Sequence, residues 1–229
     1  MVLFFSNLFY PFINAGNLMA QTQQQSQNST PLDDKWNESI LVVKRDLLFP
    51  NNPWKGLKEV DFDSYLNIIQ EHKEFIARGP AETNYDYKQI IPYLIFKHDD
   101  KLFLMQRQAK ASEKRLASKY SLGIGGHLRE EDIKGSDLFE WARREFNEEI
   151  NYSGSLDIQP LGILNDDTND VGKVHIGFIF LLNGDSADIS VKSELQSGQL
   201  FTFDQCKANY AAMETWSQLV FDFLQTKTF

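Results

Sequence analysis

The sequence predicts an α/β (α+β) fold in which helices cover a mixed β-sheet. Runs rich in β-branched and apolar residues recur along the chain, and segments with helical periodicity separate them. Strands interleaved with helices in this way are typical of a sheet packed between helical layers. The chain has 229 residues, of which 42% are hydrophobic and 13% aromatic. It can therefore bury the core of one substantial domain.

The N-terminal segment, residues 1–38, differs in composition from the rest of the chain. Residues 1–20 are apolar but are interrupted by Asn7, Pro11 and Asn14, and they contain no Lys or Arg. The charged region of a secretory signal is thus missing, and the uninterrupted apolar length is shorter than the roughly 20 residues of a membrane span. A Gln-rich tract follows at 21–30, a composition typical of disorder. We expect a disordered leader or a true start at Met19, with export or anchoring through residues 1–20 as the alternative.

The first half of the remaining chain predicts strands around one helix. Residues 39–44 are rich in β-branched side chains and predict a strand, whereas residues 61–78 carry Tyr, Ile and Phe at helical spacing. A hairpin follows, and Pro92 in its first strand lacks a backbone N–H, which weakens that strand or places it at a sheet edge. The predicted hairpin consists of strands at 89–96 and 102–106 and a polar turn at 98–101.

A long amphipathic helix is predicted after residue 135. Ser136 and Asp137 are suitable N-terminal residues, and Glu140 follows Asp137 at the spacing of a capping box. Apolar residues at four-residue intervals give the helix one face that can pack on a sheet. This stripe consists of Leu138, Ala142, Phe146 and Ile150. The remaining predicted elements are strands at 158–164, 174–182 and 199–203, a turn-rich connection at 165–172, and a C-terminal helix at 213–225.

The predicted helix carries three carboxylates on one face. Glu145, Glu148 and Glu149 stand at positions i, i+3 and i+4. Like charges at this spacing repel one another, so a solvated helix gains nothing from them. A divalent cation removes the repulsion, and ligand sets made only of oxygen suit Mg²⁺ or Mn²⁺. An acidic face alone most often indicates simple solvation, but here the glycine pair Gly125-Gly126 precedes it. The pattern therefore predicts a metal site for phosphate chemistry.

Gly126 followed by Arg144-Glu145-Phe146-x-Glu148-Glu149 resembles the consensus of the Nudix hydrolases, Gly-x5-Glu-x7-Arg-Glu-apolar-x-Glu-Glu-x-Gly-apolar. The surrounding residues, 120–127 and 162–167, look like the MutT-type predicted phosphoesterase branch of that family. Four residues are inserted between Gly126 and Arg144 relative to the consensus. The first consensus Glu therefore falls on Asp132 when counted forward and on Ser136 when counted backward, and neither is assigned a catalytic role. Asn151 replaces the last consensus Gly and, like Gly, tolerates the left-handed backbone that ends a helix.

The resemblance implies a Nudix-type α/β/α sandwich with a mixed β-sheet. Residues 39–229 would form a single Nudix domain, in which residues 39–88 are an N-terminal extension. In the family, the residues that match Gly126, Glu145, Glu148 and Glu149 hold Mg²⁺ or Mn²⁺, and the arginine that matches Arg144 braces a glutamate. Nudix enzymes frequently take their general base from a loop well after the helix. The candidates for this base are Glu194, Asp166 and Asp167.

The expected activity is hydrolysis of a diphosphate bond by an activated water, in a nucleoside-diphosphate-linked or related phosphorylated substrate. The alternative is a non-catalytic Nudix-fold module that binds or senses a ligand. An isopentenyl-diphosphate isomerase type of reaction is not expected, because Cys206 comes too late in the chain to match the cysteine of those enzymes. The catalytic set of the leading hypothesis consists of Arg144, Glu145, Glu148, Glu149 and Glu194.

The net charge of −9 bears on the partners of this protein. A chain without a basic excess has few cations with which to bind a nucleic-acid backbone, so we expect a small, nucleotide-derived phosphorylated substrate and no nucleic acid or membrane. A homodimer is compatible with the sequence. The single cysteine excludes an internal disulfide and fits a reducing compartment, so a cytoplasmic location is expected.

Overall fold

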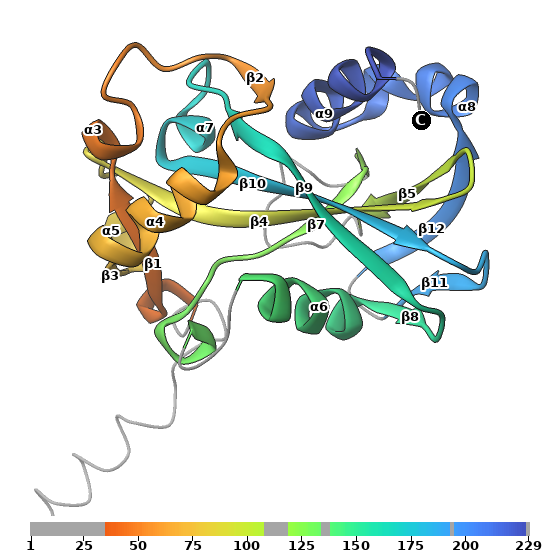
Figure 1. Cartoon of the computed structure of the whole chain (residues 1–229), viewed down its shortest axis with the longest axis horizontal. Coiled ribbons are helices and arrows are strands. Elements are labelled where there is room, and N and C mark those ends of the chain that lie inside the picture. The colour runs from red at the N-terminus through yellow and green to blue at the C-terminus, as the bar shows by residue number, and fades with distance from the viewer. Residues whose placement is uncertain (1–34, 108–118, 134–137, 193–194, 228–229) are drawn as a thin grey trace, which may run out of the picture. The chain divides into compact units, whose positions relative to one another are not determined.

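A mixed β-sheet forms the framework of the fold (Figure 1). The computed structural model describes residues 35–107, 119–133, 138–192 and 195–227, so most of the N-terminal segment 1–38 lies outside the described residues. Glu38–Phe229 forms one compact unit. Its large sheet contains β1 (Ser39–Lys44), β2 (Gly56–Lys58), β3 (Glu74–Ala77), β4 (Tyr87–His98), β5 (Lys101–Arg107), β6 (Tyr120–Ser121), β7 (Gly123–Gly125), β9 (Leu156–Asn165), β10 (His175–Gly184) and β12 (Leu195–Thr202).

The strand order of the sheet is β12-β5-β4-β10-β9-β2, with β1, β3, β6 and β7 attached off this path. β4 and β10 pair in parallel, whereas β10 pairs with β9, and β4 with β5, in antiparallel fashion. The mixed sheet predicted from the sequence is therefore confirmed. A separate two-stranded sheet joins β8 (Ile150–Tyr152) to β11 (Ile189–Val191).

Helices cover both faces of the large sheet, as Figure 1 shows for α6 on one side and α9 on the other. Along β4, Leu94 and Phe96 face a core cluster that includes Phe146 of α6, whereas Tyr93 and Ile95 face a second cluster with Phe221 of α9. This alternation is the period of a strand buried on both sides. The α/β/α sandwich is thus confirmed. The helices are α3 (Arg45–Leu48), α4 (Phe62–His72), α5 (Arg78–Ala81), α6 (Leu138–Glu149), α7 (Asp170–Val174), α8 (Phe203–Ala208) and α9 (Thr215–Gln225), with 3₁₀ turns η2 (Glu130–Ile133) and η3 (Tyr210–Ala212).

β4 is a central strand, and the edge position suggested by Pro92 is wrong. On one side, Pro92 pairs in register with Phe178 of β10. On the other side, the partner of β4 changes from β1, whose pairing ends at Gln89, to β7, whose pairing begins at Tyr93. Within the described residues, Pro92 thus lies in an interval where this side of β4 has no strand partner. A missing backbone N–H costs little in such an interval.

The helix predicted over residues 61–78 is too long. α4 ends at His72, and Lys73 takes an extended conformation with φ −62° and ψ 135°. The next four residues form β3, which pairs with β1 in antiparallel register from Ala77 opposite Ser39. Phe75 and Ile76 suit a strand as well as a helix, and the backbone groups of β1 supply hydrogen-bond partners that a longer helix would leave unused.

The acidic helix is observed as α6, and its start signals at 134–137 lie outside the described residues. Ala142 and Phe146 are buried, as the apolar stripe predicts, and Trp141 beside the stripe is buried as well. The helix ends at Glu149, and Asn151 lies in strand β8 rather than in a left-handed helix cap. The role suggested for Asn151 is therefore wrong, because β11 pairs with the chain directly after the helix and takes up its backbone hydrogen bonds.

The other predicted elements are present with shifted ends. The turn-rich connection includes the short helix α7, the strand predicted at 199–203 begins earlier as β12, and Phe203 belongs to α8. None of the helices in the described ranges combines the length and the apolar character that crossing a membrane requires.

Candidate metal and active site

The carboxylate of Glu145 lies against the backbone of Gly126. Gly126 directly follows β7, and Glu145 is in the penultimate turn of α6. A methyl group built on Gly126 would meet Oε1 of Glu145 at 2.7 Å, closer than real Cβ contacts allow. The absence of a side chain at residue 126 therefore leaves the space in which this carboxylate sits. Two residues that are 19 positions apart in the sequence are brought together in this way.

Glu145 is the carboxylate most perturbed by its surroundings. Burial disfavours its charged form, and the charges of Glu148 and Glu149 add to this effect, so its pKa is raised to about 7. Glu148 is exposed and Glu149 half-buried. The electrostatic effect shows that the three carboxylates share one region of the surface at the C-terminal half of α6. Such a group of carboxylates is stabilised by a cation more than by solvent alone.

Arg144 connects two acidic side chains. Its Nη1 donates to Oε1 of Glu148 at 2.9 Å, and its Nη2 donates to Oδ1 of Asp132 at 2.9 Å. Asp132 lies in η2 and has a side chain that is only 6% exposed. It also accepts hydrogen bonds from the backbone and the side chain of Arg129. Asp132 thus fixes the guanidinium that contacts Glu148, and it occupies the consensus position obtained by counting forward from Gly126.

The end of α6 is tied to the segment that precedes Glu194. The backbone N–H of Lys192 donates to the carbonyl oxygen of Glu149 at 2.8 Å, and the ammonium group of Lys192 donates to the carbonyl of Asn147. Glu194 itself lies outside the described residues.

Asp166 and Asp167, the other two base candidates, are engaged in structural hydrogen bonds. Asp166 is buried and accepts from the backbone and hydroxyl groups of Thr168 and from the amide of Asn169. It thereby shapes the turn after β9. Asp167 accepts hydrogen bonds from both terminal nitrogens of Arg45 and from Nζ of Lys88. This geometry does not favour either carboxylate as a general base.

Two further features lie away from the carboxylates. Cys206 is fully buried in the core cluster that packs under α9, and burial raises the pKa of its thiol to about 12. An open hollow of about 380 Å³ borders the end of α6 and includes Asn147. Because successive helical residues are about 100° apart, Asn147 points roughly 200° away from Glu145, so the hollow opens on the other side of the helix.

These observations define an α/β sandwich with a carboxylate-rich helix that faces a glycine. No family model matches the chain. Protein YmaB of Bacillus subtilis (strain 168) is 37% identical over 207 residues, which are 83% of this chain and 99% of YmaB. Tm1382, a candidate Nudix hydrolase of known crystal structure, is 31% identical with a TM-score of 0.70, and the match covers 82% of this chain and 99% of Tm1382. The chain therefore belongs to the Nudix hydrolase family.

The pattern along the sequence did not reveal every notable polar cluster. Glu82, His127 and His175 converge in space, although they are 45 and 48 residues apart in the chain. Lys88, which is fully buried, is likewise paired with Asp167 far along the sequence. No pattern of local spacing could have predicted that these residues lie together. The position of both histidines next to apolar strand residues did indicate that the histidines have buried partners.

Proposed function

We propose that this protein is a metal-dependent hydrolase that cleaves the diphosphate bond of a nucleoside-diphosphate-linked or related phosphorylated substrate. The observation that carries this proposal is the approach of the half-buried Glu145 to Gly126, with the charges of Glu148 and Glu149 near enough to raise its pKa. Membership of the Nudix hydrolase family supports the same activity.

The donor set fits a hard divalent cation. Carboxylate oxygens of Glu145, Glu148 and Glu149 and the carbonyl oxygen of Gly126 would hold Mg²⁺ or Mn²⁺, which prefer oxygen ligands. When bound, such an ion withdraws charge from a diphosphate and lowers the pKa of a coordinated water. Arg144 keeps the Glu148 carboxylate in place through its hydrogen bond, and Asp132 keeps Arg144 in place in turn.

Glu194 remains our candidate for the general base that accepts the proton of the attacking water. Lys192 is bonded through its backbone to Glu149 at the end of α6, and residue 194 follows two positions later. Water then attacks one phosphorus atom, the bridging P–O bond breaks, and two phosphate products leave.

Purified protein should be screened with nucleotide sugars, dinucleoside polyphosphates, oxidised nucleotides and coenzymes in the presence of Mg²⁺ or Mn²⁺. We expect Glu148→Gln and Glu149→Gln each to lower turnover by about 100-fold or more, because both remove a charge that holds the cation. Glu140→Gln is the matched control, since Glu140 is an exposed residue of the same helix, about 140° around the axis from Glu145 and about 180° from Glu149.

Turnover in both variants equal to that of Glu140→Gln would contradict the proposal. A ligand that raises the melting temperature but gives no product with either metal would support the non-catalytic alternative instead.

A further inference from the structure

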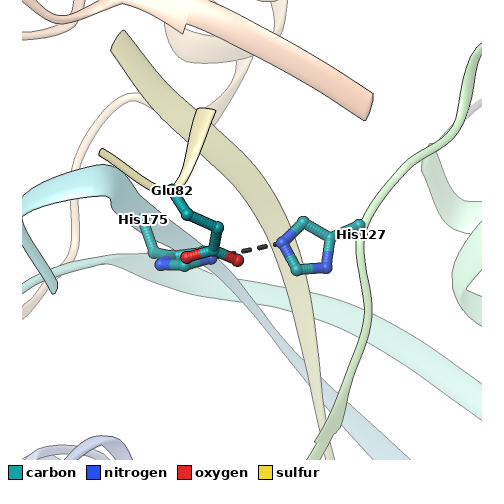
Figure 2. Close-up of side chains that lie close together, drawn as sticks. All are labelled: Glu82, His127 and His175. Atoms are coloured by element: carbon teal, nitrogen blue, oxygen red, sulfur yellow. Dashed lines mark hydrogen bonds between the residues drawn. The ribbon is translucent and has the colours of Figure 1, made fainter. Parts of the chain in front are cut away.

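A second cluster of potential metal ligands lies beside the first, at the start of β4 and β10. Figure 2 shows Glu82, His127 and His175 converging from three separate segments. Glu82 caps the C-terminal end of α5, His127 lies two residues after β7, and His175 is the first residue of β10. One ligand atom from each of the three side chains lies within 4.8 Å of the other two.

The distance between the two imidazoles matches a metal site. Nε2 of His127 and Nε2 of His175 are 3.2 Å apart. Two nitrogens that bind one tetrahedral zinc ion at 2.0–2.1 Å are about 3.3 Å apart. The two rings are tilted by 65° to each other, with centroids 5.3 Å apart, so they meet through their nitrogen atoms rather than by stacking.

The orientation of the His175 ring is fixed by a hydrogen bond at its Nδ1 atom. Its Nδ1 lies 2.7 Å from the carbonyl oxygen of Val171, which can only accept a hydrogen bond. Nδ1 therefore carries the proton, and the lone pair of a neutral ring is on Nε2, which faces His127. A histidine whose other nitrogen donates to a backbone carbonyl is the usual arrangement of a metal ligand.

Gln89 lies beside His127 on the buried side of the cluster. Its side chain is 1% exposed, and Oε1 lies 2.7 Å from Nε2 of His127. Its Nε2 has no hydrogen-bond partner among the described residues. A buried amide with one unsatisfied end costs free energy. The amide oxygen can only accept, so Nε2 of His127 carries a proton in the metal-free protein. Binding of an ion would displace this proton, and the Gln89 oxygen would then become an additional potential ligand next to His127.

Glu82 supplies the negative charge of the cluster. One of its oxygens accepts a hydrogen bond from Nε of Arg78 at 3.5 Å, which is at the long limit for such a bond. Glu82 and His127 are half-buried and His175 is buried, so an ion can reach the cluster from the side of Glu82. A direct hydrogen bond between the two imidazoles would account for their approach, but not for the nearby carboxylate.

We propose that Glu82, His127 and His175 bind one divalent transition-metal ion of the zinc type, with Gln89 as a potential fourth ligand. Imidazole nitrogens select such ions, whereas the all-oxygen set on α6 suits Mg²⁺ or Mn²⁺. The ion would join the extension before β4, which contributes Glu82, to the segment after Gly126. Its role is then to hold the extension onto the domain beside the active site.

Full-length protein stripped of metal by a chelator should be titrated with Zn²⁺ in excess Mg²⁺, and the bound zinc studied by X-ray absorption at the zinc edge. We expect one zinc ion per chain with two imidazole ligands. His127→Gln and His175→Gln should each weaken zinc binding by about 100-fold or more. His72→Gln is the matched control, because His72 is an exposed histidine of α4.

The Glu148→Gln variant should keep its zinc, which separates this site from the one on α6. Oxygen-only ligation in the wild-type protein would overturn the proposal without the use of any variant. The same would follow if folded His127→Gln and His175→Gln proteins bound zinc as tightly as His72→Gln.

Discussion

At the scale of single residues, the main determinant of the candidate site is a missing side chain. Gly126 does not adopt the positive φ that favours glycine; among the described glycines, Gly56 and Gly162 do. Its importance therefore does not come from backbone freedom. It comes from the space that the Glu145 carboxylate occupies where a Cβ would be.

We predict that Gly126→Ala lowers Mn²⁺ affinity and turnover by about 10-fold or more but leaves stability nearly unchanged. The new methyl group would displace only the flexible end of Glu145, so the free energy of unfolding should change by less than about 1 kcal/mol. Calorimetric titration with Mn²⁺ and urea unfolding measure the two effects.

The Glu145→Gln background provides the control for this prediction. If Gly126→Ala acts by moving the carboxylate, the two substitutions together should affect Mn²⁺ binding no more than Glu145→Gln alone. Fully additive losses would show that the methyl group acts by another route.

At the scale of elements, the site depends on a link between η2 and α6. Asp132 is held by Arg129 and binds Arg144, which in turn binds Glu148. Burial alone would raise the pKa of Asp132, but the hydrogen bonds and charges of Arg129 and Arg144 outweigh it and lower that pKa. Asp132 is therefore charged at neutral pH, and under the proposed function it would position the metal ligand Glu148 through Arg144.

We predict that Asp132→Asn lowers turnover about 10- to 100-fold, the range seen when a group that orients metal ligands is lost. Asp132→Glu should recover much of the activity, because it restores both the charge and the residue type of the family consensus. The control is Glu131→Gln, which removes an exposed neighbour that also contacts Arg129. Equal activity of Asp132→Asn and Glu131→Gln would disprove the positioning role.

The sequence predicted elements well where the signal is local. In α6, neighbouring members of the apolar stripe, and neighbouring carboxylates, are at most four residues apart. The strand at Ser39–Lys44 is a short run rich in β-branched residues. Both elements could therefore be found from short windows of sequence. β3 was missed because it is a strand only by pairing with β1. Asp132 as a second partner of Arg144, and the approach of the two histidines, were missed because tertiary packing brings these residues together across 12 and 48 positions.

At the scale of the whole molecule, a buried ionic network fastens the N-terminal part of the domain to the sheet. Nζ of Lys88 in β4 donates to Asp167 at 2.7 Å, to Asn165 at 2.8 Å, and to the carbonyl oxygens of Gly172 and His175. Arg45 of α3 donates to both oxygens of Asp167. Burial lowers the pKa of Lys88 to about 8 in spite of Asp167. The network thus joins α3, β4 and the connection between β9 and β10.

This network predicts a loss of stability in acid. Burial would raise the pKa of Asp167, but hydrogen bonds from Arg45, Lys88 and Asn165 lower it from 3.8 to about 2. Because the pKa in the folded state is below that in the unfolded chain, the stabilisation is complete above pH 3.8 and is lost as the pH falls through about 2. Because Asp167 is partly exposed, solvent screening reduces the size of this stabilisation to about 1 to 2 kcal/mol.

The test is urea unfolding of wild type and Asp167→Asn between pH 6 and pH 2. The difference in unfolding free energy between the two proteins should shrink by about 1 to 2 kcal/mol as the pH falls. Asp100→Asn, in the exposed turn between β4 and β5, is the control. A difference between wild type and Asp167→Asn that stays constant with pH would contradict the assignment.

The burial of Cys206 has a practical consequence. It is the only cysteine of the chain, and its thiol lies fully buried under α9 with a pKa of about 12. Thiol reagents react with exposed thiolates, so Cys206 does not react with them while the protein is folded. A cysteine introduced at any exposed position can therefore carry a spin label or a fluorophore by itself, without prior removal of the native residue.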